Sequence, residues 1–274
     1  MKNFPLGIII AFFVWAFAPY FANGIENYPA GSRFIGMADC GVAIPDLWSI
    51  SHNQAGIAYI EKPTFGLYHE QRFMIKELSL SSIATIIPVS YGCFGAQLNY
   101  FGYSKYHELK AGLAYAKKLG KRFSAGIQLN YFSTFIPSSE NQFKRINFEL
   151  GLMFLPYDNF TVGFHVFNPI ADRKTETTEI NIPTQAQFGI AYNIRKILTI
   201  AAQTEAGYAN QPIYSLGMEY LPVSVLALRL GLSSGSTNYS FGIGYINKHF
   251  QTNIAFSNHS ILGVTPHFDV LVNL

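Results

Sequence analysis

Residues 123–132 read FSAGIQLNYF. Apolar side chains at every second position, from Phe123 to Tyr131, alternate with small or polar ones from Ser124 to Asn130. A β-strand turns successive side chains to opposite faces, so this period of two predicts a strand with one apolar and one polar face. Residues 238–245 repeat the pattern, with tyrosine, phenylalanine and isoleucine on the apolar side.

Segments of this kind follow one another from about residue 62 to the end of the chain. Counting them predicts about 14 strands, an even number of the kind found in bacterial single-chain membrane barrels. The predicted strands lie near 64–70, 78–87, 92–102, 106–117, 122–134, 145–155, 159–168, 183–193, 197–206, 213–221, 224–233, 238–246, 250–257 and 265–274.

The composition agrees with a membrane barrel. Only 13% of the 274 residues are charged, whereas a soluble protein carries about a quarter. No segment after the N-terminal region reaches the roughly 18 apolar residues of a transmembrane helix. Low charge without apolar helices is typical of a β-barrel, in which every second side chain faces lipid. The net charge of +3 is not clustered with aromatic residues, so nucleic-acid binding is not expected.

The connections between predicted strands differ in length in a regular way. The even-numbered ones are short, and the odd-numbered ones include the two longest, near 135–144 and 169–182. Outer-membrane barrels have short periplasmic turns and longer external loops. We therefore expect both termini in the periplasm and the 169–182 loop outside the cell.

The first 24 residues have the features of a secretory signal peptide. Lys2 supplies a positive charge, residues 8–17 are apolar, and Ala22-Asn23-Gly24 offers small residues for cleavage. A retained N-terminal anchor helix is the alternative. Export exposes Cys40 and Cys93 to an oxidising compartment, so either a disulfide or two buried free thiols is chemically allowed.

Residues 25–62 do not alternate and precede the barrel of residues 63–274. They contain GSRFIGMADCGVA at 31–43, DLWS at 46–49 and NQAGIA at 53–58. This series resembles the start of the PorV/PorQ group of Bacteroidetes outer-membrane proteins, relatives of the FadL-type 14-stranded barrels. Gln54 replaces the proline usual in that group, and the Gly-Gly pair after Met37 is absent.

The resemblance implies two functions. FadL-like barrels pass hydrophobic solutes around an N-terminal hatch, which implies a transport or channel role for hydrophobic or small solutes. Members of the PorV/PorQ group serve as accessory barrels in type IX secretion and bind cargo or partner proteins. The short loops of this chain weaken binding of a bulky cargo, and the sequence leaves both functions open.

The glycines of residues 25–62 allow close backbone packing, so the segment can fold into the barrel lumen as a plug. A periplasmic arm that never enters the lumen is the alternative. If apolar positions face lipid, several charged residues must face inward. We expect the lumen and plug contacts to involve Arg33, Asp39, Glu149, Glu205, Glu219, Arg229 and Asp269, joined by Lys110 and His165.

These inward charges are expected to form a salt-bridged lumen that holds the plug. Glu205, Glu219 and Arg229 lie on three consecutive predicted strands and could cluster. The alternative is a contact site for a solute or a lipid headgroup.

No enzymatic activity, cofactor or metal site is expected. The chain lacks a His-Glu-x-x-His motif and a Gly-x-Ser-x-Gly elbow, and its two cysteines have no nearby histidine pair. His165 faces inward without an evident neighbouring serine, and the other six histidines, His267 among them, are assigned to the plug, loops or strand ends. The sequence thus predicts an all-β transmembrane antiparallel barrel with a small N-terminal plug, in contact with outer-membrane lipid.

Overall fold

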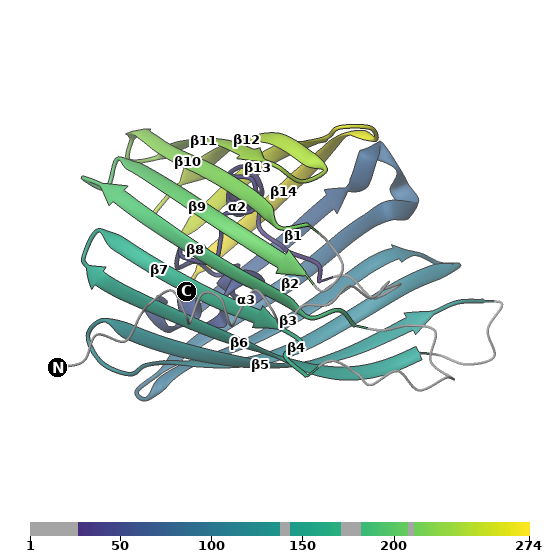
Figure 1. Cartoon of the computed structure of the whole chain (residues 1–274), viewed down its shortest axis with the longest axis horizontal. Coiled ribbons are helices and arrows are strands. Elements are labelled where there is room, and N and C mark those ends of the chain that lie inside the picture. The colour runs from purple at the N-terminus through teal and green to yellow at the C-terminus, as the bar shows by residue number, and fades with distance from the viewer. Residues whose placement is uncertain (1–26, 138–142, 171–181, 208–210) are drawn as a thin grey trace.

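The computed structural model describes residues 27–137, 143–170, 182–207 and 211–274. The predicted signal peptide and most of the 169–182 connection lie outside the described residues. Within them, the first strand pairs with the last and the sheet closes on itself (Figure 1). The predicted antiparallel barrel is confirmed.

Fourteen described strands form the barrel, and each boundary lies within about two residues of its predicted position. Each strand pairs with its neighbours in the sequence, without crossovers. They are β1 (Thr64–Gln71), β2 (Ser79–Val89), β3 (Gly92–Tyr103), β4 (Tyr106–Lys118), β5 (Phe123–Phe135), β6 (Phe143–Tyr157), β7 (Phe160–Phe167), β8 (Gln185–Ile194), β9 (Leu198–Gly207), β10 (Ile213–Val223), β11 (Leu226–Ser233), β12 (Thr237–Ile246), β13 (Phe250–His259) and β14 (Gly263–Asn273).

The apolar faces of the strands point outward. In β5, Ile127 and Leu129 are 48% and 57% exposed, whereas Gln128 between them is fully buried in the interior. Phe241 and Ile243 of β12 are likewise about half exposed, at 50% and 48%. A continuous apolar outer wall of this kind matches the lipid-facing surface of a membrane barrel.

An arginine on the outer wall should destabilise the barrel. We expect Leu129→Arg to cost about 2–4 kcal/mol if it lies near the bilayer midplane, because the charge has to enter the apolar phase. Gln128 is not a tolerant inward control, since its amide donates to Asn130 and Glu149 in a packed interior. Ser233→Arg, which faces an internal cavity, is the matched control. Equal losses in a urea titration would show that the inward and outward faces are wrongly assigned.

The orientation of the barrel is testable with two exposed lysines. Lys105 lies in the short connection between β3 and β4, and Lys196 lies between β8 and β9, at the opposite end. A membrane-impermeant maleimide applied to intact cells should modify Lys105→Cys and spare Lys196→Cys, in a background without Cys40 and Cys93. The opposite labelling pattern would place the termini outside the cell.

The segment before β1 contains three short helical turns: α2 (Ser32–Ile35), α3 (Ser49–His52) and η1 (Gln54–Tyr59). They lie inside the ring of strands (Figure 1), and the segment that carries them buries Phe34, Trp48 and Ile57 completely. Two further 3-10 turns, η2 (Arg72–Met74) and η3 (Lys76–Leu78), form the connection from β1 to β2. Among the described residues, no helix is long and apolar enough to cross a membrane.

Candidate functional site

The N-terminal segment, residues 27–62, approaches the inner wall closely at inward-facing glycines. At Gly163 of β7, an added Cβ would lie 2.1 Å from the carbonyl oxygen of Val42. At Gly231 of β11, it would lie 2.2 Å from the backbone nitrogen of Ala38. No Cβ can occupy such positions without moving the backbone, so the glycines make room for the segment.

These close approaches occur around most of the ring. A Cβ would come within 3.0 Å of the N-terminal segment at seven wall glycines, namely Gly66, Gly95, Gly126, Gly151, Gly163, Gly217 and Gly231. They belong to β1, β3, β5, β6, β7, β10 and β11. The segment therefore extends across the lumen, where it contacts opposite sides of the wall.

Arg33 connects the segment to the wall by charge. Its guanidinium lies 2.6 Å from Glu219 of β10 and 2.8 Å from Asp46 of the segment itself. Glu219 also accepts a 2.7 Å hydrogen bond from Arg229 on β11, the residue directly opposite it in the strand register. Burial alone would lower the pKa of Arg33, but the charges of Glu219 and Asp46 outweigh it and raise the pKa above its ordinary value.

Glu149 of β6 is the centre of a second cluster and is fully buried. One carboxylate oxygen lies 2.8 Å from the ammonium of Lys110, and the other lies 2.9 Å from the ring of His165. Gln54 of the segment donates a 2.7 Å hydrogen bond to the same carboxylate. The segment is therefore attached to a buried ion pair of the wall.

A third attachment uses backbone groups. The N–H of Ser32, the first residue of α2, donates to Asp269 of β14 at 2.6 Å, and Asn253 of β13 donates to the other oxygen of that carboxylate. The N–H groups of Ala38 and Val42 donate to Ser240 and Gln203 of the wall. Wall side chains thus satisfy backbone donors of a segment that has little regular structure of its own.

Two of the predicted contact residues lie apart from these clusters. Glu205 accepts a hydrogen bond from Gln187 and does not join Glu219 and Arg229, contrary to the expected cluster. Asp39 lies 3.7 Å from the ring of His52, but burial lowers the pKa of that ring to about 4, so the two form no ion pair at neutral pH. Burial and the charge of Glu70 raise the pKa of Asp39 to about 7.

Asp39 and Glu205 instead line a cavity of about 580 Å³ inside the barrel. Phe73, Ser236 and Leu262 also line it, and they belong to odd-numbered connections. The cavity therefore lies between the N-terminal segment and the end of the barrel that carries the odd-numbered connections. Its size is in the range of small-molecule sites.

Several contact residues had no distinct signal in the sequence. Asp46, Asn53 and Gln54 anchor the segment, yet they are common polar residues in a non-repetitive stretch. His267 was assigned to a strand end, but it faces the lumen from within β14 and contacts Tyr68 and Ser257. His267 and Asp269 are two residues apart in one strand and therefore share a face, so the inward assignment of Asp269 could have predicted that His267 faces the lumen.

The two cysteines are free thiols and both are buried. Cys40 packs in the segment, and Cys93 lies in β3 with its sulfur 3.5 Å from the carbonyl oxygen of Ile60. Burial raises the pKa of the Cys40 thiol to about 12. Of the two alternatives for this pair, the structure supports the free thiols.

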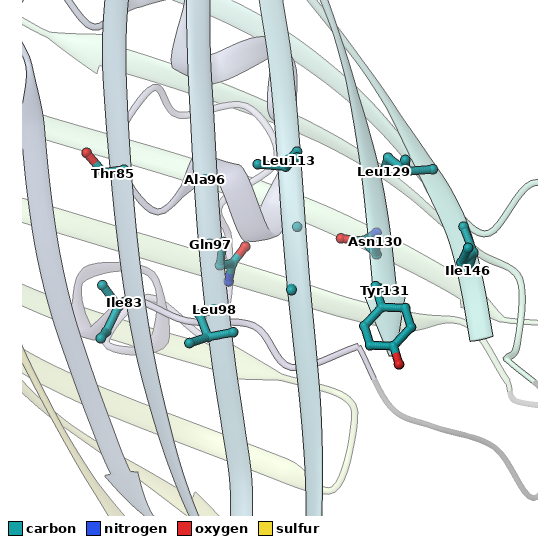
Figure 2. Close-up of a pocket in the computed structure, with 12 residues that line it drawn as sticks. Ile83, Thr85, Ala96, Gln97, Leu98, Leu113, Leu129, Asn130, Tyr131 and Ile146 are labelled. Carbon is teal, nitrogen blue, oxygen red and sulfur yellow. The ribbon is translucent and has the colours of Figure 1, made fainter. Parts of the chain in front are cut away.

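A separate depression of about 450 Å³ lies on the outer wall (Figure 2). It crosses β2 to β6, where Ala96 and Ala111 are small and larger side chains such as Ile83, Leu98 and Leu113 project around them. These large side chains are among the exposed residues of the outer face. The depression lies on the outer face of the sheet and is not part of the lumen.

Comparison with solved structures finds barrels of the same architecture. A FadL homologue of Pseudomonas aeruginosa superposes with a TM-score of 0.68 at 11% identity, covering 90% of this chain and 99% of its own. The CymD monoaromatic hydrocarbon channel gives 0.67 at 11% identity, with 92% and 99% covered. The toluene transporter TbuX of Ralstonia pickettii gives 0.64 at 12% identity, with 88% and 96% covered.

The chain has the fold of FadL-type outer-membrane barrels. No protein-family model and no curated protein matches its sequence. Two of these neighbours are named as a monoaromatic hydrocarbon channel and a toluene transporter.

Proposed function

We propose that this protein is an outer-membrane transport barrel that passes small hydrophobic solutes through its lumen. In this proposal residues 27–62 are a plug that must move during transport. The observation that carries it is the placement of the segment, which contacts wall glycines on seven strands through non-covalent interactions. The segment is held to the wall by ion pairs and hydrogen bonds, such as those of Arg33 with Glu219 and of Gln54 with Glu149, and these can break and re-form.

The internal cavity supports the proposed class of solute. Its lining includes the apolar side chains of Ile35, Phe73, Ile213 and Leu262. A pocket with apolar walls and a few polar groups is the usual form of a small-molecule site. The structural neighbours named as hydrocarbon channels and toluene transporters share the fold, and their solutes suggest the probe for a test.

An accessory role in type IX secretion rests on the N-terminal sequence motif alone. None of the comparisons supports the PorV/PorQ group or a partner protein. Two of the connections on the cavity side are short, with two residues between β3 and β4 and three between β13 and β14.

Uptake of radiolabelled toluene tests the transport proposal. Gram-negative cells that lack a barrel of this class and express the protein should take up toluene faster than cells with an empty vector. Ser215→Trp, which fills part of the internal cavity, should slow uptake, whereas Ser260→Trp in the exposed β13–β14 connection should not. Uptake at the vector level, or equal uptake by both variants, would contradict the proposal.

A further inference from the structure

On the wall of the internal cavity, Ser257 is hydrogen-bonded to His267, and the other side of the same ring lies within ion-pair distance of Glu70. The hydroxyl of Ser257 lies 2.8 Å from Nε2 of His267, and Nδ1 of the same ring lies 3.1 Å from a carboxylate oxygen of Glu70. The three residues belong to β13, β14 and β1, which are adjacent in the closed barrel. All three line the cavity.

The surroundings of Glu70 define its role. Arg72 donates a 2.7 Å hydrogen bond to one carboxylate oxygen, and the hydroxyl of Tyr68 donates to the other. Glu70 is 4% exposed and His267 is 5% exposed, so both are held away from bulk water. The ion pair with Arg72 stabilises the charged carboxylate, which can only accept hydrogen bonds.

This arrangement determines the tautomer of His267. Nδ1 faces the carboxylate of Glu70 and lies 2.8 Å from the hydroxyl oxygen of Tyr68. The hydroxyl of Tyr68 donates its own proton to Glu70, so its oxygen can only accept a hydrogen bond from Nδ1. Nδ1 must therefore carry the ring proton. In a neutral ring Nε2 then has a free lone pair, and it accepts the hydroxyl proton of Ser257.

A serine hydroxyl bound to the basic nitrogen of a histidine, whose other nitrogen is oriented by a carboxylate, is the arrangement of an activated nucleophile. We propose that Ser257 is the nucleophile of an ester-hydrolysing site, with His267 as general base and Glu70 as the residue that positions it. This inference is independent of the transport proposal, and it departs from the expectation that the chain has no active site.

The reaction needs only the ester and water. Ser257 Oγ bonds to the ester carbonyl carbon while His267 Nε2 takes the hydroxyl proton, and the bond from that carbon to the alcohol oxygen then breaks. The leaving alcohol takes the proton from Nε2. A water molecule next attacks the acyl group and passes a proton through Nε2 to Ser257, which releases the carboxylic acid.

The cavity limits the substrate to a small ester without negative charge. Its volume of about 580 Å³ holds a compact molecule, and the acidic side chains of Asp39 and Glu205 on its wall disfavour anions above the raised pKa of Asp39, about 7. Among the described residues that line the cavity, Arg72 is the one arginine or lysine. Its guanidinium is bound to Glu70 and lies over the rings of Tyr28 and Phe101, so its role is to hold the carboxylate of Glu70 in place.

Covalent labelling with diisopropyl fluorophosphate, a small uncharged probe, tests the nucleophile. Mass spectrometry of the folded protein should find the phosphoryl adduct on Ser257. Ser257→Ala should remove the adduct, and Ser233→Ala, in the same cavity, should leave it. His267→Gln should slow labelling by about 10²–10⁴-fold, the usual contribution of a general base. Heat-modifiable migration in gels identifies the variants that remain folded.

A second variant keeps the test valid if a loss of labelling reflects a damaged barrel. Ser257→Cys should be alkylated by iodoacetamide well below pH 8, because the neighbouring imidazole favours the thiolate. Adding His267→Gln should return the pH profile to that of an ordinary thiol. The rate of p-nitrophenyl acetate hydrolysis should fall in Ser257→Ala and in His267→Gln, and it should stay unchanged in Ser233→Ala.

A purely structural hydrogen-bond network predicts different results. Ser257 would stay unlabelled in the folded protein, or its labelling rate and the thiol pH profile would not respond to His267→Gln. Either result would overturn the proposal. Neither result bears on toluene uptake, so a failure of this inference can be told apart from a failure of the transport proposal.

Discussion

Deletion of residues 27–58 should leave a folded barrel whose conductance in a planar bilayer is several-fold higher than that of the intact protein. The diameter of a barrel grows roughly with the number of strands, and 14 strands enclose a lumen wider than their own side chains can fill. In the intact protein the N-terminal segment occupies this space, with Phe34 and Trp48 fully buried. Without the segment, water and ions should take its place.

The deletion also removes the backbone N–H groups from which Asp269 and Gln203 of the wall accept hydrogen bonds. Water in the open lumen can replace these bonds, so the barrel itself should persist. Heat-modifiable migration in gels would verify that the variant is folded. A folded deletion variant with the conductance of the intact protein would show that the segment does not close the lumen.

Removal of the Glu149 carboxylate should have the largest effect on stability among the wall charges. In Glu149→Ala the ammonium of Lys110 stays completely buried without its counter-ion. The loss of one member of a buried pair costs roughly 3–5 kcal/mol. The hydrogen bond from Gln54 is lost as well, so the segment should also become more accessible to protease.

The double variant Glu149→Leu with Lys110→Met is the matched control. It removes both charges, and buried pairs replaced by apolar side chains are often neutral for stability. The free energy of unfolding, measured in urea with the barrel in lipid vesicles, should therefore be higher for the double variant than for Glu149→Ala. If Glu149→Ala lowered the free energy of unfolding by less than about 1 kcal/mol, water would have to reach Lys110, and the pair would not be a buried one.

The strands were predictable because each one has an apolar lipid face and a polar inner face. In β5 the alternation alone places Gln128 inside and Leu129 outside, as the structure shows. The boundaries followed from the turns, where the alternation stops. Local period and turn chemistry therefore carry nearly all of the information needed for a barrel of this type.

The contacts inside the lumen were predictable only in part. Arg33 was expected to meet an inward carboxylate, and it contacts Glu219. Glu205 and Glu219 lie on adjacent strands, but Glu205 stands opposite Ile213 and Glu219 opposite Thr199, so the two carboxylates are separated along the strands. That stagger depends on the register of the closed barrel, which side-chain alternation does not determine.

The same limit applies to Ser257, His267 and Glu70. Glu70 is almost 190 residues from Ser257 in the sequence, and the two approach each other only because β1 pairs with β14 to close the barrel. No short motif connects them. The spacing of His267 and Asp269 predicts that both face inward, but the neighbouring serine depends on the pairing of β13 with β14.

A disulfide between the plug and the wall tests most directly whether transport through the lumen requires the segment to move. A Cβ placed on Gly189 of β8 would lie 3.3 Å from Cβ of Val42, with no contact below 3.0 Å. Disulfides join Cβ atoms about 3.5–4.5 Å apart, so a small adjustment allows Val42→Cys and Gly189→Cys to bridge. Cys40 and Cys93 are replaced by serine in this background, and each single variant serves as a control.

Toluene uptake by cells carrying the bridged variant is the deciding measurement. With the disulfide formed, uptake should fall to the level of the empty vector, and reduction with dithiothreitol should restore it. Each single variant cannot form the bridge, so its toluene uptake should be the same before and after reduction with dithiothreitol. Uptake that stays equal before and after reduction, in protein shown by mass spectrometry to be fully bridged, would contradict a mobile plug and a transport route through the lumen.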